Sequence, residues 1–186
     1  MVDYNKETSK IVPRPFFYYF ILEKPDGSKF YSATKVVAIG DIKKGEDFAI
    51  LEAEIQEDIP ILPFADTTPL LDEDVQIVSA PATLKNIGLL CLRGYVSKEK
   101  MNDFVAPAFD SNIKDLVAIQ VTGLGIGFGA SGSGVFSAKR GAIVGIVTMS
   151  FVNQAGHVTL GFIPIAKFSK FYKEYTEGKH PLPKSK

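Results

Sequence analysis

Short runs of β-branched and aromatic residues, separated by turn residues, recur along most of the chain. After Asp47, apolar and polar positions alternate through residues 48–54, as in a strand with one buried face. A turn signal at 24–28, which contains Pro, Asp and Gly, separates two such runs and predicts a β-hairpin. The pattern predicts strands at residues 16–23, 29–39, 48–54, 75–80, 88–97, 116–122, 135–137, 142–151 and 157–165. Many short strands closed by turns favour an all-β barrel or sandwich.

One segment near the C-terminus has helical periodicity instead. Aromatic residues recur every three or four positions through 166–175, with lysines between them. They are Phe168, Phe171, Tyr172 and Tyr175. We expect a short helix that docks this aromatic stripe on the core, followed by a tail rich in proline and lysine.

Composition and charge exclude some classes of partner. The chain has 186 residues, 46% hydrophobic and 23% charged, enough for one substantial core or two small ones that share an interface. Lys plus Arg equals Asp plus Glu at 21 each, so no basic excess exists to bind phosphates, and we expect no nucleic-acid partner. No window approaches the roughly 18 consecutive apolar residues of a membrane span, so none is expected.

Cysteine usage and the N-terminus bear on the compartment. Cys91 is the only cysteine, so no intramolecular disulfide can form, and its apolar surroundings at 87–92 predict a buried side chain. The polar, acid-containing N-terminus lacks the pattern of a signal peptide. Together these features favour an intracellular or intraviral setting over a secreted one. Two isolated histidines and one cysteine do not make a zinc site, so we expect no metal or cofactor.

The stretch 127–136 carries the main chemical signal. Glycines and two serines interrupt an apolar run there, so the backbone must turn tightly, and a strand follows from residue 142. A serine on such a rigid bend can serve as the nucleophile of acyl transfer, with neighbouring amides holding the oxyanion of the tetrahedral intermediate. From this stretch alone, a glycine-rich hairpin loop without chemistry is the alternative.

Several motifs resemble the trypsin-like serine proteases, and among them the HtrA/Deg-type and glutamyl-endopeptidase-like branches. Residues 129–136 read Gly-Ala-Ser-Gly-Ser-Gly-Val-Phe and, with 141–146, resemble the nucleophile loop and its hairpin, although Gly134 stands where proline is usual. Residues 47–52, Asp-Phe-Ala-Ile-Leu-Glu, resemble the segment that carries the triad aspartate. Other similar segments occur in the family order, so the resemblance spans about residues 16–168; they are 26–30, 35–40, 62–66, 94–97, 119–121 and 161–165.

The resemblance implies roles for individual residues. Ser131 would be the nucleophile, Asp47 the aspartate that orients a histidine, and the amides of Gly129 and Ser131 the oxyanion hole. A loop serine and a turn carboxylate are the structural alternatives for Ser131 and Asp47. The specificity pocket would be lined by Leu124, Gly125, Ile126, Thr148, Met149 and Ser150. Because this lining holds no acid and no histidine, it fits a small or medium apolar side chain.

The general base is the gap in this pattern. The family histidine precedes the aspartate, whereas the two histidines here, His157 and His180, both follow Ser131. The resemblance thus implies that the first two strands and the histidine have no counterpart in this chain, which alone should be inactive or nearly so. Three explanations stay open: a truncated sequence, a second chain or upstream segment that supplies the missing strands and histidine, and a true pseudoenzyme.

The expected fold is therefore all-β, a trypsin-like double β-barrel with an incomplete first barrel, a complete second barrel and a short C-terminal helix. The expected parts are an irregular N-terminus at 1–15, a partial first barrel at 16–82, the second barrel at 83–165, and the helix and tail at 166–186. The expected function is that of a serine endopeptidase domain acting on peptides or proteins through Ser131. The alternative is a catalytically dead binding or structural protein of the same fold.

Overall fold

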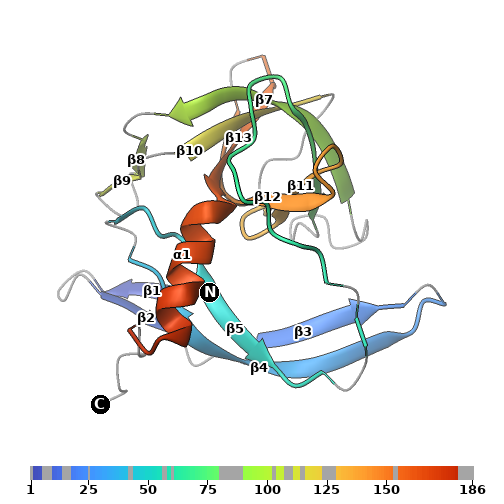
Figure 1. Ribbon diagram of the computed structural model, residues 1–186, viewed down its shortest axis with the longest axis vertical. Helices are drawn as coiled ribbons and strands as arrows, with labels where there is room; N and C mark the ends of the chain where they lie inside the picture. Colours follow the sequence, from blue (N-terminus) through green and yellow to red (C-terminus); the bar gives the residue numbers. More distant parts are fainter. Residues whose placement is uncertain are drawn as a thin grey trace. The chain divides into compact units, whose positions relative to one another are not determined.

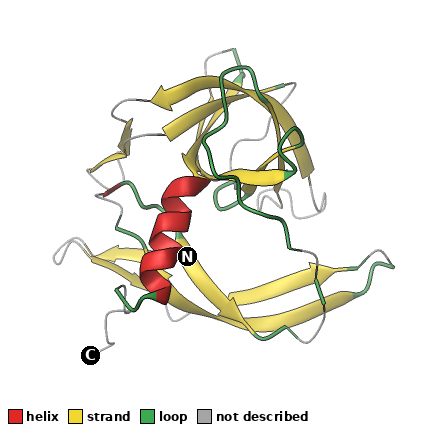
Figure 2. Cartoon of the chain, viewed as in Figure 1, coloured by secondary structure: helices red, strands yellow, loops and turns green. Residues whose placement is uncertain are grey.

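The protein forms two compact units in a computed structural model (Figures 1 and 2). We call them the N-terminal unit, made of Met1–Ile39, Ala49–Pro60 and Glu174–Lys186, and the barrel unit, made of Gly40–Phe48 and Ile61–Lys173. The residues that the structure describes are 2–5, 10–13, 18–24, 26–41, 44–55, 58–59, 61–79, 90–101, 104–106, 111–113, 116–122, 129–152 and 155–179.

Antiparallel strands make up the N-terminal unit. β3 (Tyr18–Glu23), β4 (Lys29–Ile39) and β5 (Ala49–Ala53) form a sheet in that order. The tight turn between β3 and β4 needs the left-handed conformation of Gly27, whose φ is 82° and whose amide donates to the Lys24 carbonyl. The predicted hairpin is thus confirmed.

The N-terminus differs from the expectation of an irregular segment. β1 (Val2–Asn5) and β2 (Lys10–Pro13) pair as an antiparallel hairpin. Apolar residues at 2, 4, 11 and 12 supply strand-forming side chains, and Pro13 is tolerated because it lies at the end of a strand. Residues 14–15, the end of the segment expected to be irregular, lie outside the described residues.

A closed barrel of six antiparallel strands forms the body of the barrel unit (Figure 2). Its order is β10-β13-β12-β11-β6-β7, and the ring closes because β7 also pairs with β10. The strands are β6 (Asp74–Ser79), β7 (Leu90–Met101), β10 (Leu116–Val121), β11 (Gly134–Ser137), β12 (Ala142–Val152) and β13 (Val158–Pro164). Fully buried side chains from every strand fill the interior, among them Ile77, Val96, Ile119, Val135, Val144 and Phe162.

Three details of this unit differ from the sequence predictions. β6 belongs to the closed barrel, so the boundary expected at 82/83 lies too late in the chain. Two short strands, β8 (Phe104–Ala106) and β9 (Ser111–Ile113), were not predicted. Cys91 is exposed rather than buried, because alternate side chains of β7 point outward and position 91 falls on the outer face.

The helix α1 (Ile165–Thr176) follows β13 directly, within one residue of the predicted bounds (Figure 1). Two residues beyond its last helical residue lies Gly178, whose φ is 75°. The amide of Gly178 donates to the Tyr175 carbonyl and that of Lys179 to the Glu174 carbonyl, both at 2.9 Å. This is a Schellman cap, which satisfies carbonyls that the helix end would leave unpaired. In the described part of the chain, no helix is long and apolar enough to cross a membrane.

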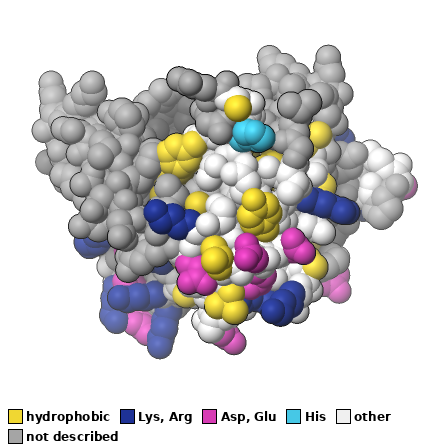
Figure 3. Space-filling model, turned by 90° about the horizontal axis from the view of Figure 1, so that it is seen from above, with side chains coloured by type: hydrophobic (Ala, Val, Ile, Leu, Met, Phe, Trp, Pro, Cys, Tyr) yellow, Lys and Arg dark blue, Asp and Glu magenta, His cyan; other side chains and the backbone are white. Residues whose placement is uncertain are grey.

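Charges of both signs share the surface. On the face drawn in Figure 3, Lys or Arg and Asp or Glu side chains both occur, with hydrophobic side chains between them. The described side chains of that face therefore form no single-sign patch, in keeping with the zero net charge of the sequence.

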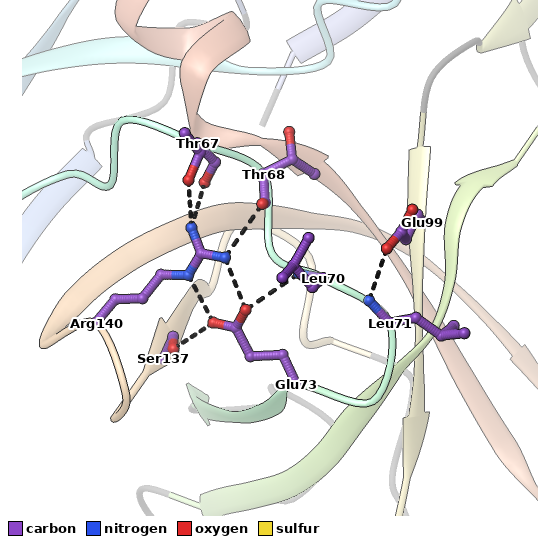
Figure 4. A network of polar contacts seen from close by, with 8 residues as sticks. All are labelled: Thr67, Thr68, Leu70, Leu71, Glu73, Glu99, Ser137 and Arg140. Atoms are coloured by element: carbon purple, nitrogen blue, oxygen red, sulfur yellow. Dashed lines mark hydrogen bonds and ion pairs between the residues drawn. The ribbon is translucent and has the colours of Figure 1, made fainter.

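A buried ion pair fastens the start of the barrel to its β11–β12 hairpin (Figure 4). Glu73, 7% exposed, lies just before β6 and accepts two hydrogen bonds of 2.7 Å, from Nε and from an Nη of Arg140. Ser137 Oγ donates to the same carboxylate at 2.6 Å, and the Leu70 amide donates at 3.1 Å. Arg140 also donates to both oxygens of Thr67. Because a charge at this depth needs such partners, the network fixes the segment before β6.

These contacts change the acidity of Glu73. The hydrogen bonds from Arg140, more than its charge alone, lower the pKa of Glu73 from 4.5 to about 2, against the opposing effect of burial. The ionised carboxylate is therefore the form that stabilises the folded barrel.

Acid should weaken the barrel unit through this residue. Because its pKa falls on folding, Glu73 contributes its full stabilisation above about pH 4.5 and loses it as the pH drops toward 2. We expect a contribution of about 3 kcal/mol to the free energy of unfolding at neutral pH. Denaturant unfolding of wild type and Glu73→Gln should give curves that converge as the pH falls through this window. Glu99→Gln, an exposed carboxylate that binds the Leu71 amide, serves as the control and should change little. A constant difference between wild type and Glu73→Gln at every pH would contradict the assignment.

Candidate active site

The loop 129–133 holds Ser131 on a rigid bend. Gly129 and Gly132 adopt positive φ values of 89° and 86°, as the sequence predicted for a tight turn. The Gly132 amide donates to the Val147 carbonyl at 2.7 Å, and the Val147 amide returns a bond of 2.9 Å to the Ser133 carbonyl. Fully buried Ala130 anchors the bend in the core, while Ser131 beside it is exposed. The serine is therefore presented to solvent on a loop fastened to β12.

Asp47 reaches the same strand from a distant part of the chain. Thr148 Oγ1, on β12, donates a short hydrogen bond to the Asp47 carboxylate. The backbone carbonyl of Thr148 accepts from Ser131 Oγ at 3.2 Å. Asp47 and Ser131 both belong to the barrel unit. Thr148 binds the first through its side chain and the second through its backbone.

Backbone contacts between its two ends close the segment 40–48, which contains Asp47. The Gly40 amide donates to the Phe48 carbonyl at 2.9 Å and closes the segment at its base. A side chain at position 40 would lie 2.2 Å from the Glu46 carbonyl oxygen, so only glycine fits this close approach. Within the loop, Glu46 accepts from the Asp41 amide at 3.0 Å, and Gly45 turns the chain with a φ of 71°.

The amides predicted to form the oxyanion hole lie on the loop 129–133. The Ser133 amide donates to the Ala130 carbonyl at 3.0 Å, and the Gly132 amide donates to Val147. By contrast, in the parts of the chain that the structure describes, the amides of Gly129 and Ser131 donate to no other residue, and both residues are exposed. Their role as an oxyanion hole stays a prediction.

The predicted specificity residues are only partly within view. Leu124, Gly125 and Ile126 lie outside the described residues. Thr148, Met149 and Ser150 are half-buried on β12, and Met149 packs over Gly161 of β13, where a Cβ would lie 2.8 Å from Met149 Cγ. Their role in a pocket stays a prediction. Thr148 has a further use that the sequence analysis missed, because a lone threonine within a strand gives no sign of which group its hydroxyl meets.

Neither histidine is brought to Ser131 by the described structure. His157 is exposed in the turn before β13, next to the Val152–Val158 pair that ends the β12–β13 ladder. Val152 is four residues along β12 from Thr148, or about 13 Å at the usual strand rise. His180 lies outside the described residues. In the described ranges, no group of three His, Cys, Asp or Glu side chains is arranged to hold a metal ion.

Comparison with known proteins identifies the fold. No protein-family model matches the sequence, and no curated protein sequence does. Among solved structures, the MamO protease domain from Magnetospirillum magneticum is similar, with a TM-score of 0.60 and 16% identity over 81% of this chain and 72% of that chain. The chain has a trypsin-like protease fold.

Two further solved structures have the same trypsin-like fold. Rv3671c from M. tuberculosis H37Rv, in an inactive form with serine changed to alanine, gives a TM-score of 0.61 and 15% identity over 83% of this chain and 69% of that chain. The serine endoprotease from Yersinia pestis gives 0.57 and 21%, over 87% of this chain and 50% of that chain. The predicted architecture is thereby confirmed, with a closed second barrel, an incomplete first sheet and a C-terminal helix.

Removing the Thr148 hydroxyl should release Asp47. We expect Thr148→Val, which keeps the side-chain shape, to lower the free energy of unfolding by about 1 kcal/mol, because a hydrogen bond to a half-buried carboxylate is lost. Denaturant unfolding of Thr148→Val, Asp47→Ala and the double variant measures the coupling between the two side chains. Thr159→Val, on neighbouring β13, is the matched control and should show no coupling to Asp47. Strict additivity for the Thr148 and Asp47 variants would show that the contact has no energetic weight.

Proposed function

We propose that this chain is a serine-endopeptidase domain with Ser131 as its nucleophile, and that it needs an imidazole from elsewhere to work. The observation that carries the proposal is the convergence of Ser131 and Asp47 on Thr148. A trypsin-like fold with a serine on a rigid bend and a carboxylate nearby provides two of the three side chains that such chemistry uses.

The chemistry divides among these groups as follows. Ser131 Oγ attacks the carbonyl carbon of a peptide bond, and the amides of Gly129 and Ser131 stabilise the negative charge on the carbonyl oxygen. The serine proton must pass to a base, and an imidazole oriented by Asp47 would accept it and later protonate the leaving amine. In the chain as it stands, Ser131 donates instead to the Thr148 carbonyl, which cannot take up the proton. The isolated chain should therefore be inactive or nearly so.

The substrate and partner follow from the same site. A peptide or protein is the substrate class, and similarity in fold to proteins named as proteases supports this choice. The half-buried β12 residues next to Ser131 carry no charge, which suits a small or medium apolar side chain on the acyl side of the cleaved bond. A second chain or an upstream segment would supply the imidazole and the missing strands.

The second candidate function is binding without catalysis. It is favoured by the hydrogen bond that ties the Ser131 hydroxyl to the Thr148 carbonyl, together with the absence of an imidazole beside it in the described residues. In that case the exposed loop 129–133 would bind an acidic or carbonyl group through its amides without cleaving anything.

Labelling with a fluorophosphonate probe, with and without added imidazole, separates the two functions. We expect imidazole to accelerate labelling, because it can occupy the position of the missing base. Labelling should vanish in Ser131→Ala and fall at least about tenfold in Asp47→Asn, which loses the negative charge that orients the imidazole.

The control for this experiment is Ser133→Ala, which removes a hydroxyl two residues from Ser131 and should label like wild type. Labelling that persists in Ser131→Ala would refute the assignment of the nucleophile. A complete lack of labelling at every imidazole concentration would favour the binding function instead.

A further inference from the structure

Phe48, the residue after Asp47, contacts two aromatic side chains of helix α1. The centroid of the Phe48 ring lies 4.9 Å from that of Phe171 and 5.4 Å from that of Phe168, with interplanar angles of 67° and 84°. The Phe64 ring contacts Phe168 at 5.7 Å and 85°. All are edge-to-face contacts, the arrangement that aromatic rings prefer. We call Phe48, Phe64, Phe168 and Phe171 the aromatic clamp, and all four belong to the barrel unit.

The clamp is itself fastened to the barrel. Phe168 and Phe171 are three residues apart and so lie on one face of the helix, with Phe171 only 2% exposed. Phe64 is held because the backbone on both sides of it pairs with β12. The Ala65 amide donates to the Ile143 carbonyl, and the Ile143 amide donates to the Pro63 carbonyl, both at 2.9 Å. The rings that meet Phe48 therefore sit on fixed elements.

Asp47 is held by two separate contacts. Its carboxylate accepts from Thr148, which fixes the end of the side chain. Its backbone is fixed through Phe48, one peptide bond away, whose ring is in the clamp and whose carbonyl accepts from Gly40. The residues before Gly40 and after Phe48 belong to the N-terminal unit, so these contacts bind the segment 40–48 to the barrel.

We propose that Phe168 and Phe171 are positioning residues for Asp47. They act through Phe48, holding the aspartate at the place from which it can orient a base next to Ser131. This inference rests on the proposed function for its catalytic meaning, but its structural core, the fixing of the segment 40–48 by the helix, can be measured without any activity.

Amide hydrogen exchange measures the structural core directly. The Gly40 amide, which donates to Phe48, reports on the closed segment, and the Val147 amide of β12 reports on the barrel as a whole. We expect Phe168→Leu and Phe171→Leu to accelerate exchange at Gly40 by about tenfold relative to Val147, because each removes an aromatic contact. Phe30→Leu, a half-buried phenylalanine of β4 outside the clamp, should leave this ratio unchanged. Equal changes at Gly40 and Val147, or none at Gly40, would overturn the proposal.

A double-variant experiment tests the catalytic meaning. Phe171→Leu should slow imidazole-dependent labelling of Ser131 several-fold, and this effect should disappear when Asp47 is already Asn. An equal effect in both backgrounds would show that Phe171 does not act through Asp47. If wild type is not labelled at all, the proposed function fails, and the exchange ratio alone decides whether the clamp fixes Asp47.

Discussion

The arrangement of the candidate site depends on a single residue of β12, Thr148. Its hydroxyl meets Asp47 and its carbonyl meets Ser131, so one position of one strand sets the relative placement of two groups far apart in sequence. Side chain and backbone act independently here, because the hydroxyl binds a carboxylate while the carbonyl accepts from a serine. Its strand, β12, is hydrogen-bonded to β11 on one side and to β13 on the other, and Thr148 lies where the β12–β13 register shifts, between Val147 and Met149.

The segments that sequence reasoning predicted well are those with strong local signals. Alternation and turn chemistry identified the β3–β4 hairpin and most barrel strands, and aromatic spacing identified α1, because these patterns reflect the backbone geometry of each element. The loop at Ser131 was predicted for the same reason: its glycines are where the positive φ values fall. Long-range contacts left no such trace, so neither the Thr148–Asp47 bond nor the pairing of Glu73 with Arg140 could be read from local pattern. Outward-facing Cys91 was mispredicted because its apolar neighbours masked the alternation of β7.

Two kinds of interaction hold loops to the strands and helix of the barrel unit: a hydrogen-bonded ion pair and aromatic contacts. Where Glu73 is almost fully buried, charge-assisted hydrogen bonds from Arg140 and Ser137 compensate for the loss of water. Where the segment 40–48 meets the helix, edge-to-face contacts between aromatic rings form without polar partners. The first kind responds to acid, and the second does not. A change of pH would therefore affect the entry to β6 before it affects the aromatic contacts around Asp47.

The division of the chain into units has a consequence for any attempt to isolate one of them. Asp47 lies in the segment Gly40–Phe48, which belongs to the barrel unit although it connects β4 and β5 of the N-terminal unit. A fragment that begins at Ile61 would retain the six barrel strands, Ser131 and Thr148. It would lack Asp47, whose carboxylate Thr148 binds. Cutting the chain between the two units would therefore separate the candidate nucleophile from the carboxylate that shares its strand contact, although both belong to the barrel unit.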